Sequence, residues 1–90
     1  MKYSDAREVY KNKWILFEAI SAYSEGGERI VTDLAVIKSY EKGNEALKDY
    51  AIYHKANKQK EYYVYNTINE TLEIEERAWI GVRVNGWFKV

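Results

Sequence analysis

The chain has 90 residues, 47% of them hydrophobic and 16% aromatic, and 14 Lys and Arg balance 14 Asp and Glu. A chain this short has room for one core, so we expect a single domain over residues 1–90. The absence of cysteine excludes disulfides, thiolate catalysis and cysteine-based metal centres, and zero net charge disfavours broad electrostatic binding of nucleic acid.

The first predicted elements are a short helix and a hairpin. The stretch "SDAREVYKNK" offers Ser4 or Asp5 as N-cap of a helix over 6–11. Residues 14–23 and 30–37 are rich in β-branched and aromatic side chains, which predicts two strands. Between them "SEGGE" supplies the glycines that a tight hairpin turn needs.

The main helix and the remaining strands follow. In "KGNEALKDYAIYHKANK" the apolar residues are three and four apart, so the sequence predicts an amphipathic helix over 45–57 with Asn44 as N-cap. "EYYVYNT" predicts a strand at 61–66, and Thr67 with Glu70 resembles the start of a single helical turn.

Beyond that turn, "LEIEE" and "RAWIGVRV" read as one further strand, and Asn85-Gly86 predicts a hairpin that returns "WFKV" as a short strand. The fold class we expect is α+β: an antiparallel sheet of four to five strands with one main helix packed on one face, in the order α-β-β-α-β-β-β.

The hairpin register predicts two unlike sheet faces. If Gly26 and Gly27 occupy the turn, pairing runs outward from Glu25 and Glu28 without a break. The first face, which we expect beneath the main helix, then collects Ile15, Phe17, Ala19, Tyr23, Ile30, Leu34 and Val36. The second face collects Trp14, Leu16, Glu18, Ile20, Ala22, Val31, Asp33, Ala35 and Ile37.

The later strands extend this division. Val64 is most simply placed towards the core, which leaves its neighbours Tyr63 and Tyr65 on the second face. The last hairpin adds an arginine among aromatic rings. The candidate partner- or ligand-binding set on the second face is Trp14, Leu16, Glu18, Ile20, Asp33, Tyr63, Tyr65, Trp79, Arg83 and Phe88.

Three charged residues stand out on this apolar face, namely Glu18, Asp33 and Arg83. Charges in apolar surroundings are costly unless they are paired, so they indicate either a structural ion pair or a site for a ligand or partner. Neither a nucleophile nor a cluster of metal ligands joins the carboxylates in the sequence. We therefore expect no catalytic residue, no metal site, no cofactor and no enzymatic activity.

Other charged stretches have ordinary structural readings. His54 falls on the apolar stripe of the main helix and receives no role. The lysines of "KANKQK" suit the C-terminal end of a helix, or they contact nucleic acid beside the tyrosines of 62–65. The acids of "NETLEIEE" protect an edge strand, or they mimic nucleic acid towards a basic partner. The chain shows no h-region and no span of about 20 apolar residues, so we expect a cytoplasmic protein.

The segment "YKNKWILFE", followed by a second strand, a helix and "EYYVYNT", resembles small bacterial domains of unknown function that begin with a Tyr-x-x-Lys-Trp strand. The resemblance covers the first two thirds of the chain. It implies a compact α+β fold and a bacterial or phage setting, and it transfers no catalytic residue.

Together these features favour a non-enzymatic protein-interaction module that uses the second sheet face, either as a homodimer or to dock a protein partner in an accessory or inhibitory role. The apolar surplus around Glu18 motivates this hypothesis. The alternative is a binder of a small nucleotide-like or anionic ligand, held by Arg83 and nearby aromatic rings. A weaker alternative is binding of single-stranded nucleic acid.

Overall fold

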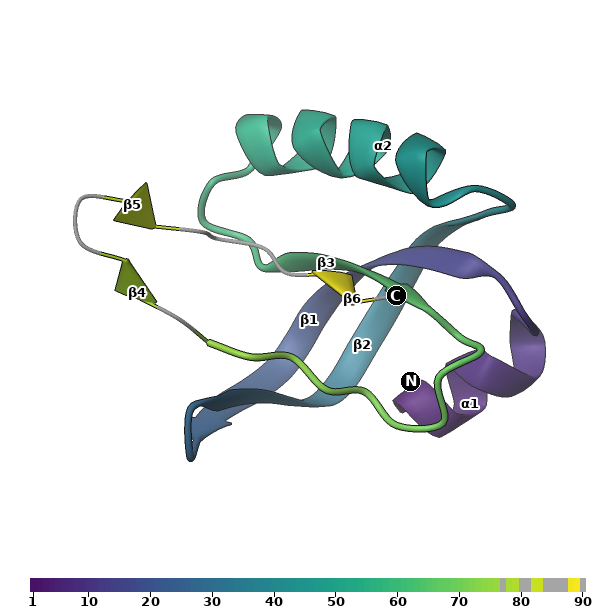
Figure 1. Ribbon diagram of the computed structural model, residues 1–90, viewed down its shortest axis with the longest axis horizontal. Helices are drawn as coiled ribbons and strands as arrows, with labels where there is room; N and C mark the ends of the chain where they lie inside the picture. Colours follow the sequence, from purple (N-terminus) through teal and green to yellow (C-terminus); the bar gives the residue numbers. More distant parts are fainter. Residues whose placement is uncertain (77, 80–81, 84–87, 90) are drawn as a thin grey trace.

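The computed structural model describes the backbone of residues 1–76, 78–79, 82–83 and 88–89, and the side chains of residues 1–76. Figure 1 shows a helix, α1 (Tyr3–Val9), then strands β1 (Trp14–Glu25) and β2 (Glu28–Tyr40), helix α2 (Gly43–Ala56) and strand β3 (Tyr62–Asn66). Three two-residue strands follow: β4 (Ala78–Trp79), β5 (Val82–Arg83) and β6 (Phe88–Lys89). The predicted α+β class is confirmed.

The sheet is antiparallel over three strands in the order β2-β1-β3. At the other edge of β3 the two-residue β6 pairs in parallel, with Val64 opposite Phe88. Only the three-stranded part of the predicted sheet of four to five antiparallel strands is therefore confirmed. The predicted order beyond β3 stays a prediction.

The strand predicted over 72–84 does not form as one element. Its two described parts, β4 and β5, pair with each other in antiparallel fashion, with Ala78 opposite Arg83 and Trp79 opposite Val82. The predicted Asn85-Gly86 turn lies outside the described residues.

The hairpin turn between β1 and β2 is the one that the sequence predicts. Gly26 and Gly27 have φ angles of 58° and 79°, and Glu25 lies opposite Glu28. Two consecutive residues with positive φ form the turn whose twist matches that of the flanking strands, and glycine adopts this conformation without steric cost. The register next to the turn is therefore confirmed.

Further from the turn, two extra residues interrupt the register. Ile20 in β1 and Thr32 in β2 have no partner across the hairpin, and a third irregularity follows Leu16. Thr32 Oγ1 donates a hydrogen bond of 3.1 Å to the Ser21 carbonyl oxygen. Side chains alternate between the two faces with a period of two. One extra residue on each strand therefore exchanges the faces of the residues between the bulges and the turn, relative to an uninterrupted hairpin.

The exchange corrects two predicted positions near the turn. Val31, expected on the second face, packs against the cluster that contains Phe17 and Leu34. Tyr23, expected in the core, is 48% exposed. The predicted strand pairing therefore holds on both sides of these two bulges, with Ala19 opposite Leu34, whereas the predicted faces of the residues near the turn were wrong.

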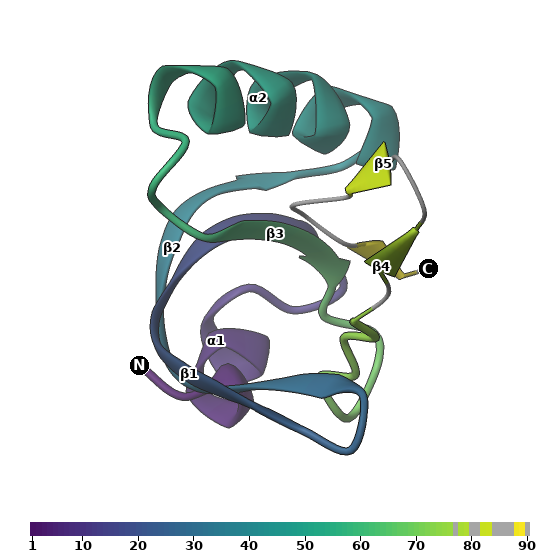
Figure 2. The same ribbon diagram turned by 90° about the vertical axis from the view of Figure 1, so that its left-hand side faces the viewer.

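The sheet curves around α1, which lies in its hollow (Figure 2). The buried cluster on this concave face unites the inner side chains of α1 with those of β1, β2 and β3 and with the segment after β3. Its members are Tyr3, Ala6, Ile15, Phe17, Leu34, Tyr63, Tyr65 and Ile74.

Helix α2 lies on the opposite, convex face (Figure 2). The buried cluster beneath it consists of Leu16, Tyr40, Ala46, Tyr62 and Val64, with Trp14, Ile37, Leu47 and Tyr50 partly buried against it. Tyr40 also donates a hydrogen bond of 2.7 Å to Asp49 Oδ2 in α2. The predicted position of the main helix over the Ile15 and Phe17 face is therefore wrong.

The correction has a physical reason. Residues 14–17, "WILF", are apolar on both faces, and a short continuous apolar run indicates a strand that is buried on both sides. Such a run does not say which helix covers which face. The short helix α1 takes one face and α2 takes the other.

The helix boundaries also differ from those predicted. α1 starts at Tyr3, and Lys2 is its N-cap without a side-chain bond, so neither Ser4 nor Asp5 caps it. Thr67 starts no helix. It is buried, donates to the Tyr10 carbonyl oxygen at 2.5 Å and accepts from the Lys13 N–H at 3.0 Å, which ties the end of β3 to the chain after α1.

Candidate functional site

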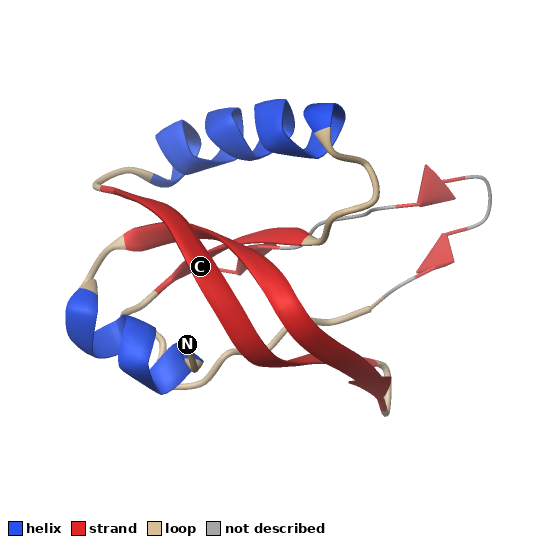
Figure 3. Cartoon of the chain, turned by 180° about the vertical axis from the view of Figure 1, so that it is seen from behind, coloured by secondary structure: helices blue, strands red, loops and turns tan. Residues whose placement is uncertain are grey.

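The candidate site begins where α2 stops covering the convex face. Seen from behind, α2 crosses one end of the long β1–β2 hairpin, and the rest of both strands lies beyond the helix (Figure 3). Under the helix, Leu16 is 0% exposed. A Cβ added to Gly43, the first residue of α2, would lie 3.0 Å from the Trp14 ring, so helix and strand approach closely there. Of these two predicted site residues, Leu16 is buried in the core and Trp14 is partly buried against it.

Glu18 marks the border of this cover. It lies opposite Tyr62 of β3 and Ala35 of β2, on the same face as Leu16. Its carboxylate is 26% exposed and lies 4.0 Å from Lys60 Nζ, in the segment after α2. Such a distant and partly exposed pair contributes little to stability.

Beyond Glu18 the convex face is open. Ile20 is 52% exposed, Tyr23 is 48% exposed, and Ile30, which pairs with Tyr23, is half-buried. Glu25 and Glu28 lie opposite each other at the end of the hairpin, on the same side by strand alternation, and both are exposed. We name this surface the hairpin patch, which consists of Ile20, Tyr23, Glu25, Glu28 and Ile30.

Asp33 has a partner of its own. Its Oδ1 lies 2.6 Å from the amino group of Met1, which also donates a hydrogen bond of 2.7 Å to the Leu34 carbonyl oxygen. The Leu34 N–H donates back to the Met1 carbonyl oxygen at 2.8 Å. Glu18 and Asp33 are thus paired with separate cations. The third member of the predicted charged set is Arg83, whose side chain lies outside the described residues.

Tyr63 and Tyr65 lie on the other face from the one predicted. They sit opposite Phe17 and Ile15, and both are buried in the concave cluster. Their hydroxyls are engaged: that of Tyr63 donates to Glu61 Oε2, and that of Tyr65 donates to the Thr71 carbonyl oxygen at 2.9 Å. Burial, reinforced by the bond to Glu61, raises the pKa of Tyr63. Neither ring is available on the convex face.

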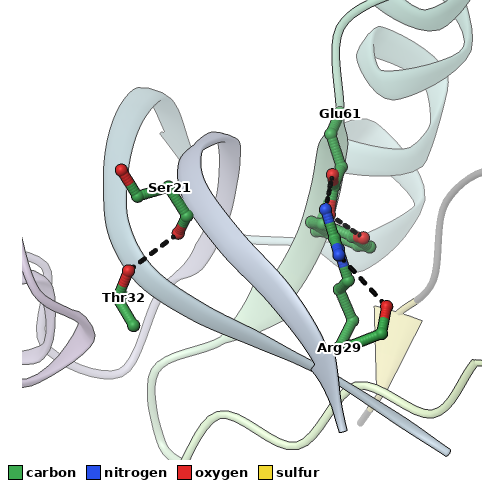
Figure 4. A network of polar contacts seen from close by, with 6 residues as sticks. Ser21, Arg29, Thr32 and Glu61 are labelled. Atoms are coloured by element: carbon green, nitrogen blue, oxygen red, sulfur yellow. Dashed lines mark hydrogen bonds and ion pairs between the residues drawn. The ribbon is translucent and has the colours of Figure 1, made fainter.

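An ion pair that the sequence did not reveal lies at the edge of the concave face. Figure 4 shows Arg29 of β2 reaching Glu61, just before β3, through two hydrogen bonds of 2.8 and 2.9 Å, while a third bond reaches Ser24 Oγ at 3.1 Å. Chiefly through this hydrogen bond, Arg29 lowers the pKa of the Glu61 carboxyl. The two residues are far apart in sequence, so only the bulged register, which turns Arg29 inward, could have indicated the pair.

The remaining predicted site residues are Trp79, Arg83 and Phe88. Their backbones belong to β4, β5 and β6, and their side chains lie outside the description. Because β4 and β5 pair with each other rather than forming one strand, the argument that placed Trp79 and Arg83 on one face no longer holds.

Within the described residues, no group of three or more His, Asp or Glu side chains has an arrangement that could hold a metal ion. None of the described helices combines the length and apolar character needed to cross a bilayer.

Comparison with known proteins gives no relative for this arrangement. No family model, no curated protein and no solved structure matches the chain. The resemblance carried by "YKNKWILFE" and "EYYVYNT" stays a prediction.

Proposed function

We propose that the protein is a non-enzymatic protein-interaction module that docks a protein partner through the hairpin patch. The observation that carries this proposal is the exposure of Ile20 and Tyr23 on the face where α2 buries Leu16. Single exposed apolar residues are ordinary, whereas neighbouring ones on a sheet face indicate an interaction surface. Tyrosine is also enriched among the residues that dominate binding energy.

The proposed site is smaller than the one that the sequence suggested. Of the predicted residues, Ile20 remains at its centre and Glu18 at its border, while Tyr23, Ile30 and the two turn carboxylates are new members. Three of the others, Leu16, Tyr63 and Tyr65, lie inside the two hydrophobic clusters, and Trp14 packs against one of them, so these residues contribute to stability instead.

The two other functions considered from the sequence receive little support. A small ligand was expected to be held by Arg83 and nearby aromatic rings. Two of these rings, those of Tyr63 and Tyr65, are buried and their hydroxyls are bonded, and the Arg83 side chain lies outside the described residues. Stacking of nucleic-acid bases requires exposed aromatic faces, and Tyr62, Tyr63 and Tyr65 are all buried. The accessory or inhibitory role in a bacterium or phage that the resemblance implies stays a prediction.

Site-specific cross-linking tests the proposal. A photoreactive phenylalanine analogue replaces Tyr23 in one variant and the exposed Lys11, which lies after α1, in a control variant. We expect one discrete cross-linked species from position 23 and none from position 11. Equal or absent cross-linking at the two positions would contradict the proposal.

A pair of substitutions then measures the energetic role of the patch. Replacement of both Ile20 and Tyr23 by Ser removes the apolar contact area, and each truncated central residue costs about 1–2 kcal/mol of binding free energy or more. We expect cross-linking from a probe at position 30 to fall at least tenfold while thermal unfolding changes little. Undiminished cross-linking would show that the partner binds elsewhere.

A further inference from the structure

At its turn end the hairpin patch joins a row of three carboxylates from distant parts of the chain. Glu25 and Glu28 are partners across the turn, and Glu75, in the segment after β3, lies opposite Glu28 in an isolated antiparallel bridge. Residues that are partners on neighbouring strands carry their side chains on the same face. All three glutamates are exposed. We name this set the glutamate row.

Backbone hydrogen bonds hold the row in place. On one side of the bridge the Glu76 N–H donates to the Gly27 carbonyl oxygen, and on the other side the Arg29 N–H donates to the Ile74 carbonyl oxygen, both at 2.9 Å. The segment after β3 passes the hairpin at this point (Figure 1). The row is therefore preformed, and a partner does not have to order it on binding.

The row receives little positive charge from its surroundings. Neither Glu25 nor Glu28 forms an ion pair with another side chain of residues 1–76. Between positions 18 and 28 the sequence contains no Lys or Arg. The next residue, Arg29, forms its ion pair with Glu61 on the concave side.

The cation at the other border of the hairpin patch is too far away to neutralise the row. Lys60 Nζ lies 4.0 Å from the Glu18 carboxylate. From Glu18 to Glu25 the path along β1 is roughly 20 Å, at about 3.3 Å per residue. This path is about twice the distance over which physiological salt screens a surface charge. The hairpin patch therefore has an acidic end that is distinct from its border with α2.

The row is unfavourable in the free protein. Like charges directly opposite each other on neighbouring strands destabilise a sheet, and lysine or arginine side chains from a partner remove this cost. The apolar part of the patch, Ile20, Tyr23 and Ile30, lies next to the row on the same face. The surface therefore fits a segment that has both apolar and cationic side chains.

We infer that the partner of the hairpin patch is a basic protein segment. Its apolar side chains pack on Ile20, Tyr23 and Ile30, and its lysine or arginine side chains pair with the glutamate row. This inference rests on the proposed function and names the chemistry of the partner. Nucleic acids and anionic membranes have the same sign of charge as the row, which repels them. A second copy that presented its own hairpin patch would bring two glutamate rows together, which is unfavourable for the same reason.

Two synthetic peptides test the preference for positive charge. Both form an amphipathic helix with the same leucines on one side, and every other position is lysine in one peptide and glutamate in the other. The protein carries the photoreactive analogue at position 23 or, as a control, at position 11. We expect the lysine peptide to cross-link to position 23 about tenfold more than the glutamate peptide does, and also more than it cross-links to position 11.

A matched pair of variants identifies the carboxylates responsible. The row variant carries Glu25→Gln and Glu28→Gln, and the control variant carries Glu8→Gln and Glu70→Gln, which are exposed and outside the patch. We expect the row variant to bind the lysine peptide about fivefold more weakly, the loss expected for two exposed ion pairs, and the control variant to bind like the wild type. The thermal midpoint of the row variant should equal or exceed that of the wild type, because like charges have been removed.

Equal cross-linking of the two peptides to position 23, whether strong or absent, overturns the inference, and so do equal effects of the two variants. The discrete species expected from position 23 separates the inference from the proposed function. If this species forms equally well with the row variant, or has the mass of two copies of this chain, the basic partner is wrong and the interaction module stands. If position 23 yields no such species, the proposed function itself fails.

Discussion

The concave and convex faces of the sheet are built from the same strands, yet only one of them is closed along the hairpin. On the concave face, α1 and the segment after β3 cover the cluster around Phe17, and the hydroxyls of Tyr3, Tyr63 and Tyr65 all find partners. On the convex face, α2 covers Leu16 but leaves Ile20 and Tyr23 about half exposed. Burial in this chain depends on which helix or loop reaches a face, because both faces are apolar.

The sharpest test of this contrast compares Leu16→Ala with Ile20→Ala. The two residues lie on the same face of β1, one under α2 and the other beyond it. Truncation of the buried leucine should cost about 2–5 kcal/mol of unfolding free energy, because it removes apolar contacts and leaves a cavity. Truncation of the exposed isoleucine should cost about 1 kcal/mol or less.

Urea denaturation measures both variants. Similar losses of unfolding free energy would mean that α2 does not seal its half of the convex face.

On the concave face, Tyr65→Phe removes one hydroxyl and little else. The Tyr65 hydroxyl donates to the Thr71 carbonyl oxygen and accepts from the Glu73 N–H at 3.1 Å, so it holds the segment after β3 against the sheet. We expect the free energy of unfolding to fall by about 1–3 kcal/mol, since two backbone groups lose their hydrogen-bond partner. Hydrogen exchange should quicken at residues 71–74. The exposed Tyr23→Phe is the control, and an equal effect there would contradict the explanation.

At the contact of α2 with β1, Gly43→Ala tests the close approach to Trp14. The new methyl group would lie 3.0 Å from the indole, so the ring must shift. In a double-mutant cycle with Trp14→Leu, we expect a coupling free energy of about 0.5–1 kcal/mol, because the smaller side chain relieves the clash. Additive effects of the two substitutions would show that the ring adapts freely.

An effect of similar size, which vanishes at low pH, concerns the Arg29–Glu61 pair. The folded-state pKa of Glu61 is lowered, so the pair stabilises the fold at a pH above the carboxyl's unfolded pKa of about 4.3 and loses this contribution as pH falls through the folded value. We expect Glu61→Gln to lower the free energy of unfolding by about 0.5–1 kcal/mol at pH 7 and by progressively less below pH 4.

Chemical denaturation at several pH values follows this difference. Arg29→Gln should show the same loss of pH dependence, because either substitution breaks the pair. If Arg29→Gln kept the pH profile of the wild type, Arg29 would not be the cause of the lowered Glu61 pKa.

Local signals predicted the parts of the fold that local chemistry determines. The Gly26-Gly27 turn, the two strands beside it and the existence of α2 depend on glycine conformation, side-chain type and apolar spacing, all of which are visible in short windows. The predicted position of Glu18 on the face of Trp14 and Leu16 followed from the same hairpin pattern and agrees with the observed strand pairing.

The rest depends on interactions between distant segments. Neither Ile20 nor Thr32 is a residue type that signals a bulge, so the sequence contained no cue for the exchange of faces. The choice of α1 rather than α2 for the concave face depends on how the connections run, since Ile15 and Leu16 are equally apolar. For the same reason Tyr63 and Tyr65 were assigned to the wrong face, and the proposed site became smaller and moved towards the turn.

The paired extra residues at Ile20 and Thr32 also have an evolutionary consequence. A chain that lost one residue from each strand at these positions would keep its turn and every other amino acid, yet Ser24 and Arg29 would face outward and Tyr23 and Ile30 inward. An acidic, apolar surface would become a polar, cationic one without a single substitution. Insertion and deletion, rather than point mutation, are thus the shortest route to a different outer surface on this hairpin.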